Sequence, residues 1–402
     1  MSGQRSVTEN IEALSQFGQL PDGSVTRLVY DDAWVAAMTW WLRQGQQQGM
    51  QATIDSYGNG FLTYPGSQSG TVAVGSHIDS VQHAGHYDGA YGIVAAQLAM
   101  TRLVARLGQP QRTMMAIAFS EEEGSRFPVS FTGSRHYSGV AETDDTLTDA
   151  KGVTFNDARQ QAVQSLSEHF NQTEQALPDE FMELHIEQGP LLESTHDDIG
   201  VVSTICELEE FVVTLTGEAN HAGTTPMHLR HDALMAAVQV ISQLDEQAHQ
   251  VGEPFVFTVG QLEVSPGSSN VIPGQVRFTI DIRHPQRRVV DEFEQVIRQL
   301  LADVNEVRVD LKRVTASYPE VRMDPRLMGQ FEQICQQRGL AYRVMPSGAA
   351  HDTQMMNAKV PTAMLFVPSH RGISHSVAEY TSPEALENGV QVLMAQLYQE
   401  CY

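Results

Sequence analysis

The sequence is poor in cysteine, and long apolar runs are absent. Its 402 residues include three cysteines, Cys206, Cys335 and Cys401, an odd number at wide spacing that suits neither a disulfide framework nor a zinc ribbon. The N-terminus, MSGQRSVTEN, lacks the basic and apolar regions of a secretory signal. No apolar run approaches the ~18–20 residues of a membrane span. We therefore expect a soluble, cytoplasmic protein with no membrane partner.

Basic residues are also scarce. Lysine and arginine number 25 against 49 aspartates and glutamates, which gives a formal net charge of −24. Such a surface repels phosphate backbones at long range, so nucleic acid is not an expected partner. The acidity names no substrate, and its simplest role is to keep the protein soluble. Because a single core rarely grows beyond about 250–300 residues, this chain is expected to form two domains.

Two apolar runs of β-type composition end in polar residues. They are TVAVGSHIDS at residues 71–80 and TMMAIAFS at residues 113–120. Between them, Ala90 to Leu107 has apolar residues at helical spacing and stops at Gly108. Strand, polar loop, helix and strand form the unit of a parallel α/β sheet. The predicted class is α/β, with a mixed, mostly parallel sheet covered by helices on both faces.

The middle of the chain has a different pattern. Strands are predicted at 210–217, 255–264, 276–283 and 307–314, with helices at 232–247 and 289–304. This β-α-β-β-α-β order predicts a smaller α+β, ferredoxin-like domain. A helix at 326–338 and strands at 342–346 and 362–368 then return to the first sheet. We predict a discontinuous first domain of residues 1–208 and 323–402, interrupted by a second domain of residues 209–322.

Residues with metal-binding side chains follow the first predicted strand. His77 and Asp79 end this strand, and Asp88 lies in the loop beyond it. Imidazole and carboxylate groups at one rim of a sheet are ligands that zinc accepts. His83 and His86 lie in the same loop and compete for the assignment. Without a metal, His77 would only form a structural hydrogen bond and Asp88 would be a helix N-cap.

Three consecutive glutamates, Glu121, Glu122 and Glu123, follow the second strand. Carboxylates at this spacing repel one another, and a bound cation would keep them ionised. One of them can bind a metal while its neighbour takes a proton from the attacking water. The alternative is a solvated acidic loop. His185 and His375 complete a set of three imidazoles and two carboxylates, enough for two metal ions.

Eight motifs follow one another along the chain: GSHIDS, EEEGSRF, ELHIEQGP, NHAGTTPM, NVIPG, DIRHP, SGAAHD and GISH. In this order they resemble the M20-type metallopeptidase superfamily. More narrowly, they resemble its branch of allantoate amidohydrolases, N-carbamoyl-L-amino-acid hydrolases and β-ureidopropionases. The resemblance runs from near Leu20 to the C-terminus.

The resemblance implies two divalent ions per subunit, with zinc the first expectation and manganese, cobalt or nickel also suited to the ligands. Asp88 would bridge the two ions. His77 and His185 would complete one site, and Glu123 and His375 would complete the other.

The resemblance also implies roles for residues around the metals. Glu122 would be the catalytic base, a register set by Gly124 because the family's ligand glutamate immediately precedes that glycine. Asp79 would orient the imidazole of His77. His221 would reach from the smaller domain of one subunit into the active site of the other subunit of a homodimer, where it would stabilise an oxyanion. The alternative for His221 is a turn histidine.

The remaining motifs supply the expected substrate contacts, which are Gln188, Asn270, Arg283, Ser347, Gly348 and Ala349. Arg283 would bind a carboxylate through its planar guanidinium, although it could instead brace the turn that follows it. Arg126 is a second candidate for that role, and it more readily supports the metal loop. The expected substrate is a small ureido or amide compound bearing a carboxylate, such as allantoate or an N-carbamoyl-L-amino acid. The rival functions are an aminoacylase or dipeptidase at the same site, and a catalytically inactive scaffold.

Two departures from the family pattern stand out. Ala350 occupies a position that is usually glycine, and the acidic segment at residues 207–210 replaces a segment that often reads Gly-Gln-Arg-Arg. A basic pair replaced by acidic residues could alter recognition of an anionic substrate. This departure therefore concerns the substrate and leaves the chemistry unchanged.

Overall fold

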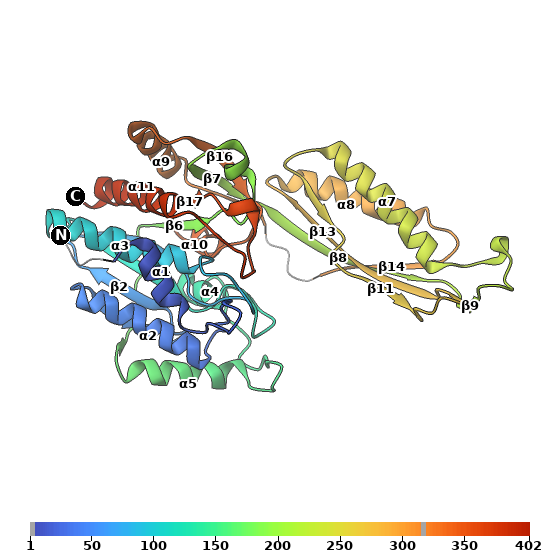
Figure 1. Cartoon of the computed structure of the whole chain (residues 1–402), viewed down its shortest axis with the longest axis horizontal. Helices are drawn as coiled ribbons and strands as arrows, with labels where there is room; N and C mark the ends of the chain where they lie inside the picture. The colour runs from blue at the N-terminus through green and yellow to red at the C-terminus, as the bar shows by residue number, and fades with distance from the viewer. Residues whose placement is uncertain (1–4, 315–318) are drawn as a thin grey trace. The chain divides into compact units, whose positions relative to one another are not determined.

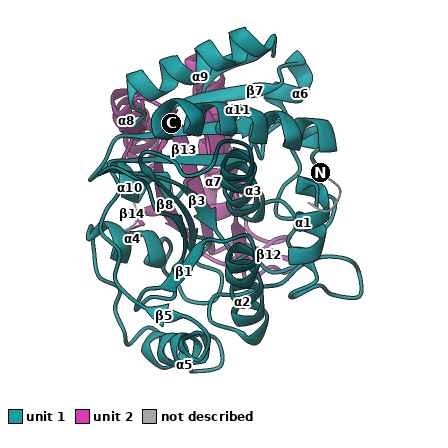
Figure 2. Cartoon of the chain, turned by 90° about the vertical axis from the view of Figure 1, so that its left-hand side faces the viewer, with its two compact units in different colours: residues 1–203, 322–345, 351–402 teal, residues 204–321, 346–350 magenta. Residues whose placement is uncertain are grey.

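The computed structural model describes residues 5–314 and 319–402. The chain divides into two compact units, shown in two colours in Figure 2. Unit 1 comprises residues 1–203, 322–345 and 351–402, and unit 2 comprises residues 204–321 and 346–350. Among the described residues, none of the helices combines the length and apolar character needed to cross a membrane.

Unit 1 is built on a ten-stranded sheet with the order β15-β7-β17-β6-β3-β4-β2-β1-β5, and β16 pairs with β7. Its strands in chain order are β1 (Gln51–Ile54), β2 (Gly60–Tyr64), β3 (Thr71–His77), β4 (Thr113–Phe119), β5 (Asn171–Gln172), β6 (Glu180–Ile186), β7 (Ile199–Ile205), β15 (Val321–Arg322), β16 (Tyr342–Ser347) and β17 (Thr362–Val367). The four central strands, β17, β6, β3 and β4, run parallel, whereas β2 and β7 pair with them antiparallel. The predicted mixed, mostly parallel sheet is confirmed.

Helices cover both faces of this sheet (Figure 1). Successive side chains of β3 show the reason, because Val72 and Val74 join the larger core whereas Ala73 joins a smaller core on the other face. The larger core includes α1 (Val7–Ser15), α2 (Asp32–Gln47), α3 (Ala90–Leu107), α5 (Phe155–Ser167), α9 (Pro325–Arg338) and α11 (Pro383–Cys401). The smaller core receives Tyr137 from α4 (Thr132–Ser138) and Met356 from α10 (Thr353–Asn357). With both faces covered, all seven residues of β6 are buried.

Unit 2 has a five-stranded antiparallel sheet of order β10-β13-β8-β14, with β11 also paired to β13. Its strands are β8 (Glu207–Thr216), β10 (Val256–Thr258), β11 (Leu262–Ser265), β13 (Gln275–His284) and β14 (Arg308–Arg313). Alternate residues of β8 are buried, including Phe211, Val213 and Leu215. They pack in one core with apolar residues of α7 (Ala233–Val251) and α8 (Arg287–Ala302). A separate two-stranded ladder joins β9 (Asn220–His221) to β12 (Val271–Ile272).

One predicted element of unit 2 is wrong. The single strand expected at 255–264 is two short strands, β10 and β11, which pair with different parts of β13. Between them, the backbone N–H of Gln261 donates to the side-chain hydroxyl of Thr279, 3.1 Å away. The registers of β10 and β11 on β13 differ by one residue, because residues 259–261 lie opposite only residues 279 and 280, so the strand is interrupted there.

Candidate metal centre

All five predicted metal ligands lie at or beyond the C-terminal ends of parallel strands, at one rim of the unit 1 sheet. His77 is the last residue of β3, and Asp88 lies between β3 and α3. His185 is the penultimate residue of β6, whereas Glu123 follows β4 and His375 follows β17. Because the carboxyl ends of adjacent parallel strands meet at one edge, ligands far apart in sequence converge.

The carboxylate of Asp88 lies at the centre of this cluster. Its Oδ1 atom is 3.1 Å from Nε2 of His185 and 3.5 Å from Nε2 of His77. Its Oδ2 atom is 3.0 Å from Nε2 of His375, which is 3.6 Å from Oε1 of Glu123. The five residues therefore form two triplets that share Asp88, and within each triplet the candidate ligand atoms lie within 4.8 Å of one another. Each oxygen of one carboxylate faces a different triplet.

The electrostatics of the cluster suit a cation. Burial raises the pKa of Glu123 to about 7, and repulsion from Asp88 acts in the same direction. Burial likewise raises the pKa of Glu122 well above its usual value, with repulsion from Glu123 opposing the attraction of His77. Burial also opposes ionisation of Asp88, but hydrogen bonds from His185, His375 and His77 outweigh it and hold its pKa well below the usual value. Three imidazoles and closely spaced carboxylates are a donor set that fits divalent metal ions, because a cation would relieve this repulsion.

The three consecutive glutamates point in different directions. Glu121 is buried and turns back into its own loop, where its carboxylate accepts hydrogen bonds from the backbone N–H groups of Gly124 and Thr132. Glu122 and Glu123 instead form a group with His77 whose candidate ligand atoms lie within 4.8 Å of one another. The alternative of a solvated acidic loop is therefore wrong.

Asp79 joins the glutamate loop to the imidazole of His77. Its Oδ1 atom lies 3.3 Å from Nδ1 of His77, so the carboxylate faces the ring nitrogen on the side away from Asp88. The same carboxylate accepts hydrogen bonds from the backbone N–H groups of Glu122, at 3.1 Å, and Glu123, at 3.3 Å. Nδ1 of His77 is also 3.1 Å from the backbone carbonyl oxygen of Asp79. Asp79 therefore faces the imidazole through both its backbone and its buried side chain, and the same side chain bonds to the backbone of two further site residues.

The start of α3 excludes the alternative that Asp88 is only the N-cap of this helix. The helix N-cap is Gly89, with no side-chain capping bond, so Asp88 is not an N-cap. Gly89 has φ of +63°, and a Cβ atom there would overlap the ring of His77. Only glycine combines this backbone conformation with so close an approach.

The two other histidines of the loop after β3 face elsewhere. His83 lies 3.5 Å from the carboxylate of Asp22, and its Nδ1 is 3.3 Å from the hydroxyl of Ser24. Nε2 of His86 lies 2.9 Å from the carbonyl oxygen of Gly23. Both therefore bind the N-terminal segment, and they do not compete for the metal centre.

Gln188, a predicted substrate contact, lies against the shared carboxylate. Its side-chain amide donates to Oδ2 of Asp88 at 2.8 Å and lies 3.4 Å from Nε2 of His375. Gln188 and His375 both have positive φ, 56° and 54°, which is uncommon for residues other than glycine. Backbone strain of this kind concentrates at functional sites.

The other predicted substrate contacts lie in unit 2. The Arg283 guanidinium makes two 2.9 Å bonds to the carboxylate of Asp281 and a third bond, 2.8 Å long, to the carbonyl oxygen of Gly348. Ser347 and Ala349 bond to each other in the same turn. Part of the guanidinium is therefore already engaged within unit 2, and its remaining N–H groups could bind a ligand.

His221 lies on β9 of unit 2, and Asn270 immediately precedes β12, the strand that pairs with β9. The backbone N–H of Ala222 donates to the carbonyl oxygen of Asn270 at 3.0 Å, and β9 pairs with β12 beside them. Nδ1 of His221 accepts a hydrogen bond from the N–H of Gly223 at 3.0 Å. In a neutral imidazole this bond places the proton on Nε2, which is then a donor.

The acidic segment that departs from the family pattern is part of an ion-pair network in unit 2. Glu207 and Glu209 are buried, and their carboxylates lie 2.9 Å from Arg287 and 3.1 Å from Arg313, respectively. Arg313 also pairs with Glu294 of α8. These two glutamates therefore have structural partners within their own unit.

Arg126 supports the loop after β4, as expected. Its Nε atom donates to Asp149 at 3.1 Å, and its Nη1 atom donates to the carbonyl oxygen of Val29 at 2.8 Å. These bonds engage the guanidinium with the protein itself.

Three residues of the site were not found from the sequence. His351 packs its ring against the edge of His185, with centroids 4.7 Å apart. Ser374 donates to Glu379 at 2.8 Å, and its hydroxyl lies 3.3 Å from Oδ2 of Asp88. His351 and Ser374 belong to the motifs SGAAHD and GISH, which could have indicated them, whereas no motif points to Glu379.

Comparisons with known proteins show which family the chain belongs to. The profile of "Peptidase family M20/M25/M40" matches residues 73–399, most of the chain. The chain belongs to this family. Within it, the chain is 39% identical to "Allantoate amidohydrolase" of Escherichia coli (strain K12), over 98% of each protein. It is 33% identical to "N-carbamoyl-L-amino-acid amidohydrolase" of Paenarthrobacter aurescens, also over 98% of each protein.

Solved structures of M20 relatives have the same fold. The crystal structure titled amidase, hydantoinase/carbamoylase family, from Burkholderia multivorans superposes with a TM-score of 0.92 at 31% identity. The match covers 98% of this chain and 97% of that chain. The relatives named here are amidohydrolases and amidases, which act on C–N bonds.

Proposed function

We propose that this M20 protein is a dinuclear metal-dependent amidohydrolase that cleaves the carbamoyl C–N bond of a small, carboxylate-bearing ureido compound. The observation that carries the proposal is the carboxylate of Asp88, whose two oxygens face two separate triplets of ligands. His77 and His185 would hold one ion with Asp88, and Glu123 and His375 would hold the other. A shared carboxylate between two such sets is the arrangement expected of a two-metal hydrolase.

Glu122 is the proposed catalytic base. When bound, the ions would act as Lewis acids that polarise the carbonyl and acidify water. Glu122 would take a proton from the attacking water and return it to the leaving nitrogen. Its buried position and raised pKa support this role, because they favour a carboxyl that can hold a proton between the two steps.

His221 is the proposed donor to the oxyanion. The hydrogen bond from Gly223 to Nδ1 leaves the Nε2–H group to donate, which is the tautomer that this role requires. The net reaction converts R–NH–CO–NH₂ and one water into R–NH₂, carbon dioxide and ammonia. For allantoate, the amine product would be a ureidoglycine-type compound.

The names of the relatives favour ureido substrates over the acylated amino acids or dipeptides of the rival function. Two allantoate amidohydrolases, from Escherichia coli and Bacillus subtilis, share 39% and 38% identity with this chain, against 33% for the carbamoylase of Paenarthrobacter aurescens. Allantoate is therefore the first substrate to test. Three buried, unpaired thiols, Cys206, Cys335 and Cys401, support a reducing, cytoplasmic compartment.

A substrate panel tests this function. The purified protein is loaded separately with zinc, manganese, cobalt or nickel and given allantoate, N-carbamoyl-L-amino acids, N-acyl amino acids and dipeptides, with ammonia and amine release measured. We expect turnover of at least one ureido compound and little of the acyl compounds. Turnover of acyl compounds alone would contradict the proposal, and no turnover with any metal would favour a scaffold.

We further propose that the protein is a homodimer formed through unit 2, with His221 acting in the partner's active site. Unit 2 overlaps the predicted domain of residues 209–322 and also includes residues 204–208 and 346–350. Unit 2 exposes large apolar side chains close together in sequence: Met227, Leu229, Met235 and Val238. Strand β14 is also an edge of its sheet. Apolar patches and open edges of this kind are typical of protein interfaces.

Mixing two inactive variants tests the shared site. His221→Ala and Glu122→Gln subunits are each expected to be inactive, but a mixed dimer has one site with both residues intact. Mixing with subunit exchange should therefore restore part of the activity. Subunit exchange is verified by mass spectrometry of labelled subunits. If exchange occurs and no activity returns, action in trans is contradicted.

A further inference from the structure

Glu379 connects two loops of the metal centre that are far apart in sequence. Its Oε1 atom accepts hydrogen bonds from the backbone N–H groups of Tyr87, at 2.8 Å, and Asp88, at 3.3 Å. Its Oε2 atom accepts a 2.8 Å hydrogen bond from the hydroxyl of Ser374, the residue before His375. The side chain is only 5% exposed. One buried carboxylate therefore joins the loop that carries Asp88 to the loop that carries His375.

Close contacts surround Glu379 where the two loops meet. A Cβ atom at Gly85 would overlap the Glu379 side chain, so a glycine lets the first loop approach it closely. Next to these bonds, the rings of Tyr87 and Tyr380 meet edge to face, with centroids 6.3 Å apart. Residues of both loops therefore contribute to the contact between them.

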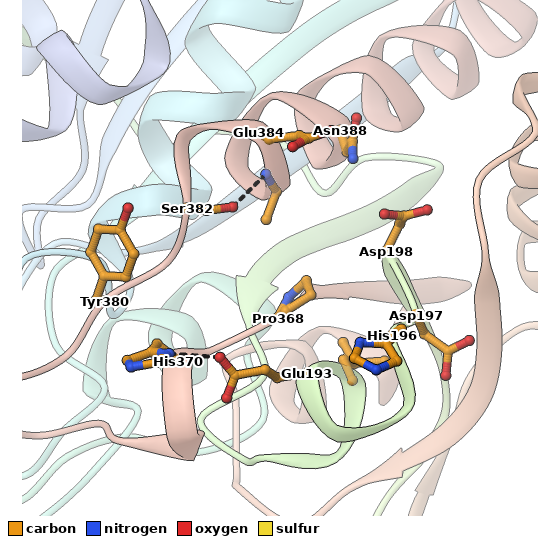
Figure 3. A pocket seen from close by; sticks show the side chains of 12 residues that line it. Glu193, His196, Asp197, Asp198, Pro368, His370, Tyr380, Ser382, Glu384 and Asn388 are labelled. Carbon is orange, nitrogen blue, oxygen red and sulfur yellow. Dashed lines mark hydrogen bonds and ion pairs between the residues drawn. The ribbon is translucent and has the colours of Figure 1, made fainter.

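The chain after Glu379 borders open space. A pocket of about 450 Å³ is lined by Tyr380 and Ser382, together with His370 and Glu193 (Figure 3). Nδ1 of His370 lies 2.6 Å from Oε1 of Glu193. Packing therefore supports this stretch incompletely, and the hydrogen bonds of Glu379 restrain the loop where it meets the metal centre.

We propose that Glu379 is a positioning residue that holds Asp88 and His375 at the separation needed to bind the same ion. The inference rests on the proposed metal-dependent function. Outer groups that fix metal ligands typically change metal affinity by about 10–100-fold when removed. Because Glu379 acts on the loop of His375 as well as on Asp88, its loss weakens the triplet Asp88, Glu123 and His375 more than the triplet His77, Asp88 and His185.

Cobalt titration of the metal-free full-length protein tests this role, with the visible absorption of bound Co²⁺ and the bound stoichiometry as readouts. Glu379→Ala is expected to weaken one of the two binding steps by about 10–100-fold while the other changes much less. Glu379→Gln should stay within about threefold of the original protein, because the amide oxygen can still accept both N–H groups and the amide N–H can bond to Ser374. Gly85→Ala should weaken the same step as Glu379→Ala, since it displaces Glu379 without removing it.

Glu180→Ala is the matched control. Glu180 is also buried, but it lies at the opposite end of β6, where it pairs with Arg112 and Arg326. This variant should lower the Tm and leave both cobalt steps unchanged. If Glu379→Ala does not fold, Gly85→Ala and Ser374→Ala are titrated instead, and the same selective weakening of one cobalt-binding step is expected.

Three results would overturn the inference. They are unchanged cobalt binding by Glu379→Ala and Gly85→Ala, equal losses of cobalt affinity in Glu379→Gln and Glu379→Ala, or the same selective loss in Glu180→Ala. These results differ from failure of the proposed function itself. In that case the original protein would bind no divalent ion or would turn over no ureido substrate.

Discussion

Buried acidic residues cluster in both units, but their partners differ. In unit 2, Glu207 and Glu209 lie beside arginines of the same unit. At the rim of unit 1, the carboxylates of Asp88 and Glu123 lie beside histidines and beside each other. The first cluster faces guanidinium groups, which are always charged, whereas the second faces imidazoles, which as neutral rings can bind a cation together with the carboxylates. The partners of a buried carboxylate, more than its burial, therefore distinguish a structural cluster from a metal centre.

The largest effects are expected from substitutions in the rim. Glu122→Gln should reduce turnover by about 10²–10⁴-fold or more while leaving metal content nearly intact, because it removes a base and no ligand. Glu123→Gln should lower the occupancy of one metal site. Metal analysis of both purified variants, together with ureido turnover, distinguishes the two roles. Loss of metal in the Glu122 variant alone would reverse them.

Arg283 tests the distinction between structural and functional charges, because it is paired within unit 2 and is also a proposed substrate contact. If it binds the substrate carboxylate, Arg283→Ala should lower kcat/KM for that substrate by tens- to thousands-fold, corresponding to the about 2–5 kcal/mol of a lost desolvated ion pair. The neutral amide analogue should be affected little. Arg283→Lys should also be poor, because an ammonium lacks the planar fork.

Arg277→Ala is a matched control on the same strand, since Arg277 is 42% exposed and lies 3.8 Å from Glu263. It should change neither substrate's kcat/KM. Equal losses on the charged and neutral substrates in Arg283→Ala would show that Arg283 supports structure through Asp281 and Gly348.

The smallest effect is expected in the unit 2 cluster. Arg313→Met leaves Glu209 and Glu294 buried with fewer partners, and it should cost about 1–3 kcal/mol of unfolding free energy. This is less than for a fully buried pair, because the Arg313 side chain is 38% exposed. We expect a Tm lower by several degrees, measured by calorimetry, with kcat/KM at 25 °C unchanged.

The exposed pair of Arg288 and Glu292 provides the control for this prediction. Its side chains are 78% and 62% exposed and 3.5 Å apart, so Arg288→Met should leave the Tm nearly unchanged. A fall in kcat/KM in Arg313→Met with no change in Tm would mean that the acidic segment of unit 2 affects the substrate after all.

Much of the rim could be predicted because local patterns define its elements. The apolar spacing and Gly108 gave α3 its observed bounds, Ala90–Leu107, and the buried strands β3 and β4 begin where their apolar runs begin. Ligand types at strand ends then converge through the geometry of parallel sheets. These inferences need only the order of residues along the chain.

What could not be predicted depends on contacts between distant segments or on side-chain direction. Glu379 bonds to the backbone of Asp88, 291 residues away, and backbone N–H groups carry no sequence signal. The three glutamates look alike in the sequence, and only the fold turns Glu121 back toward Thr132. The strand expected at 255–264 is divided by one extra residue relative to β13, and the apolar pattern does not indicate such a shift of register.

The central claim is that Asp88 serves two metal ions, and metal stoichiometry tests it most directly. Metal-free protein and its Asp88→Ala and His375→Ala variants are titrated with zinc, and bound metal is counted by mass spectrometry under native conditions. The account predicts two ions in the original protein, one in His375→Ala and none held tightly in Asp88→Ala. Retention of one tightly bound ion by Asp88→Ala, or a single ion in the original protein at saturation, would contradict it.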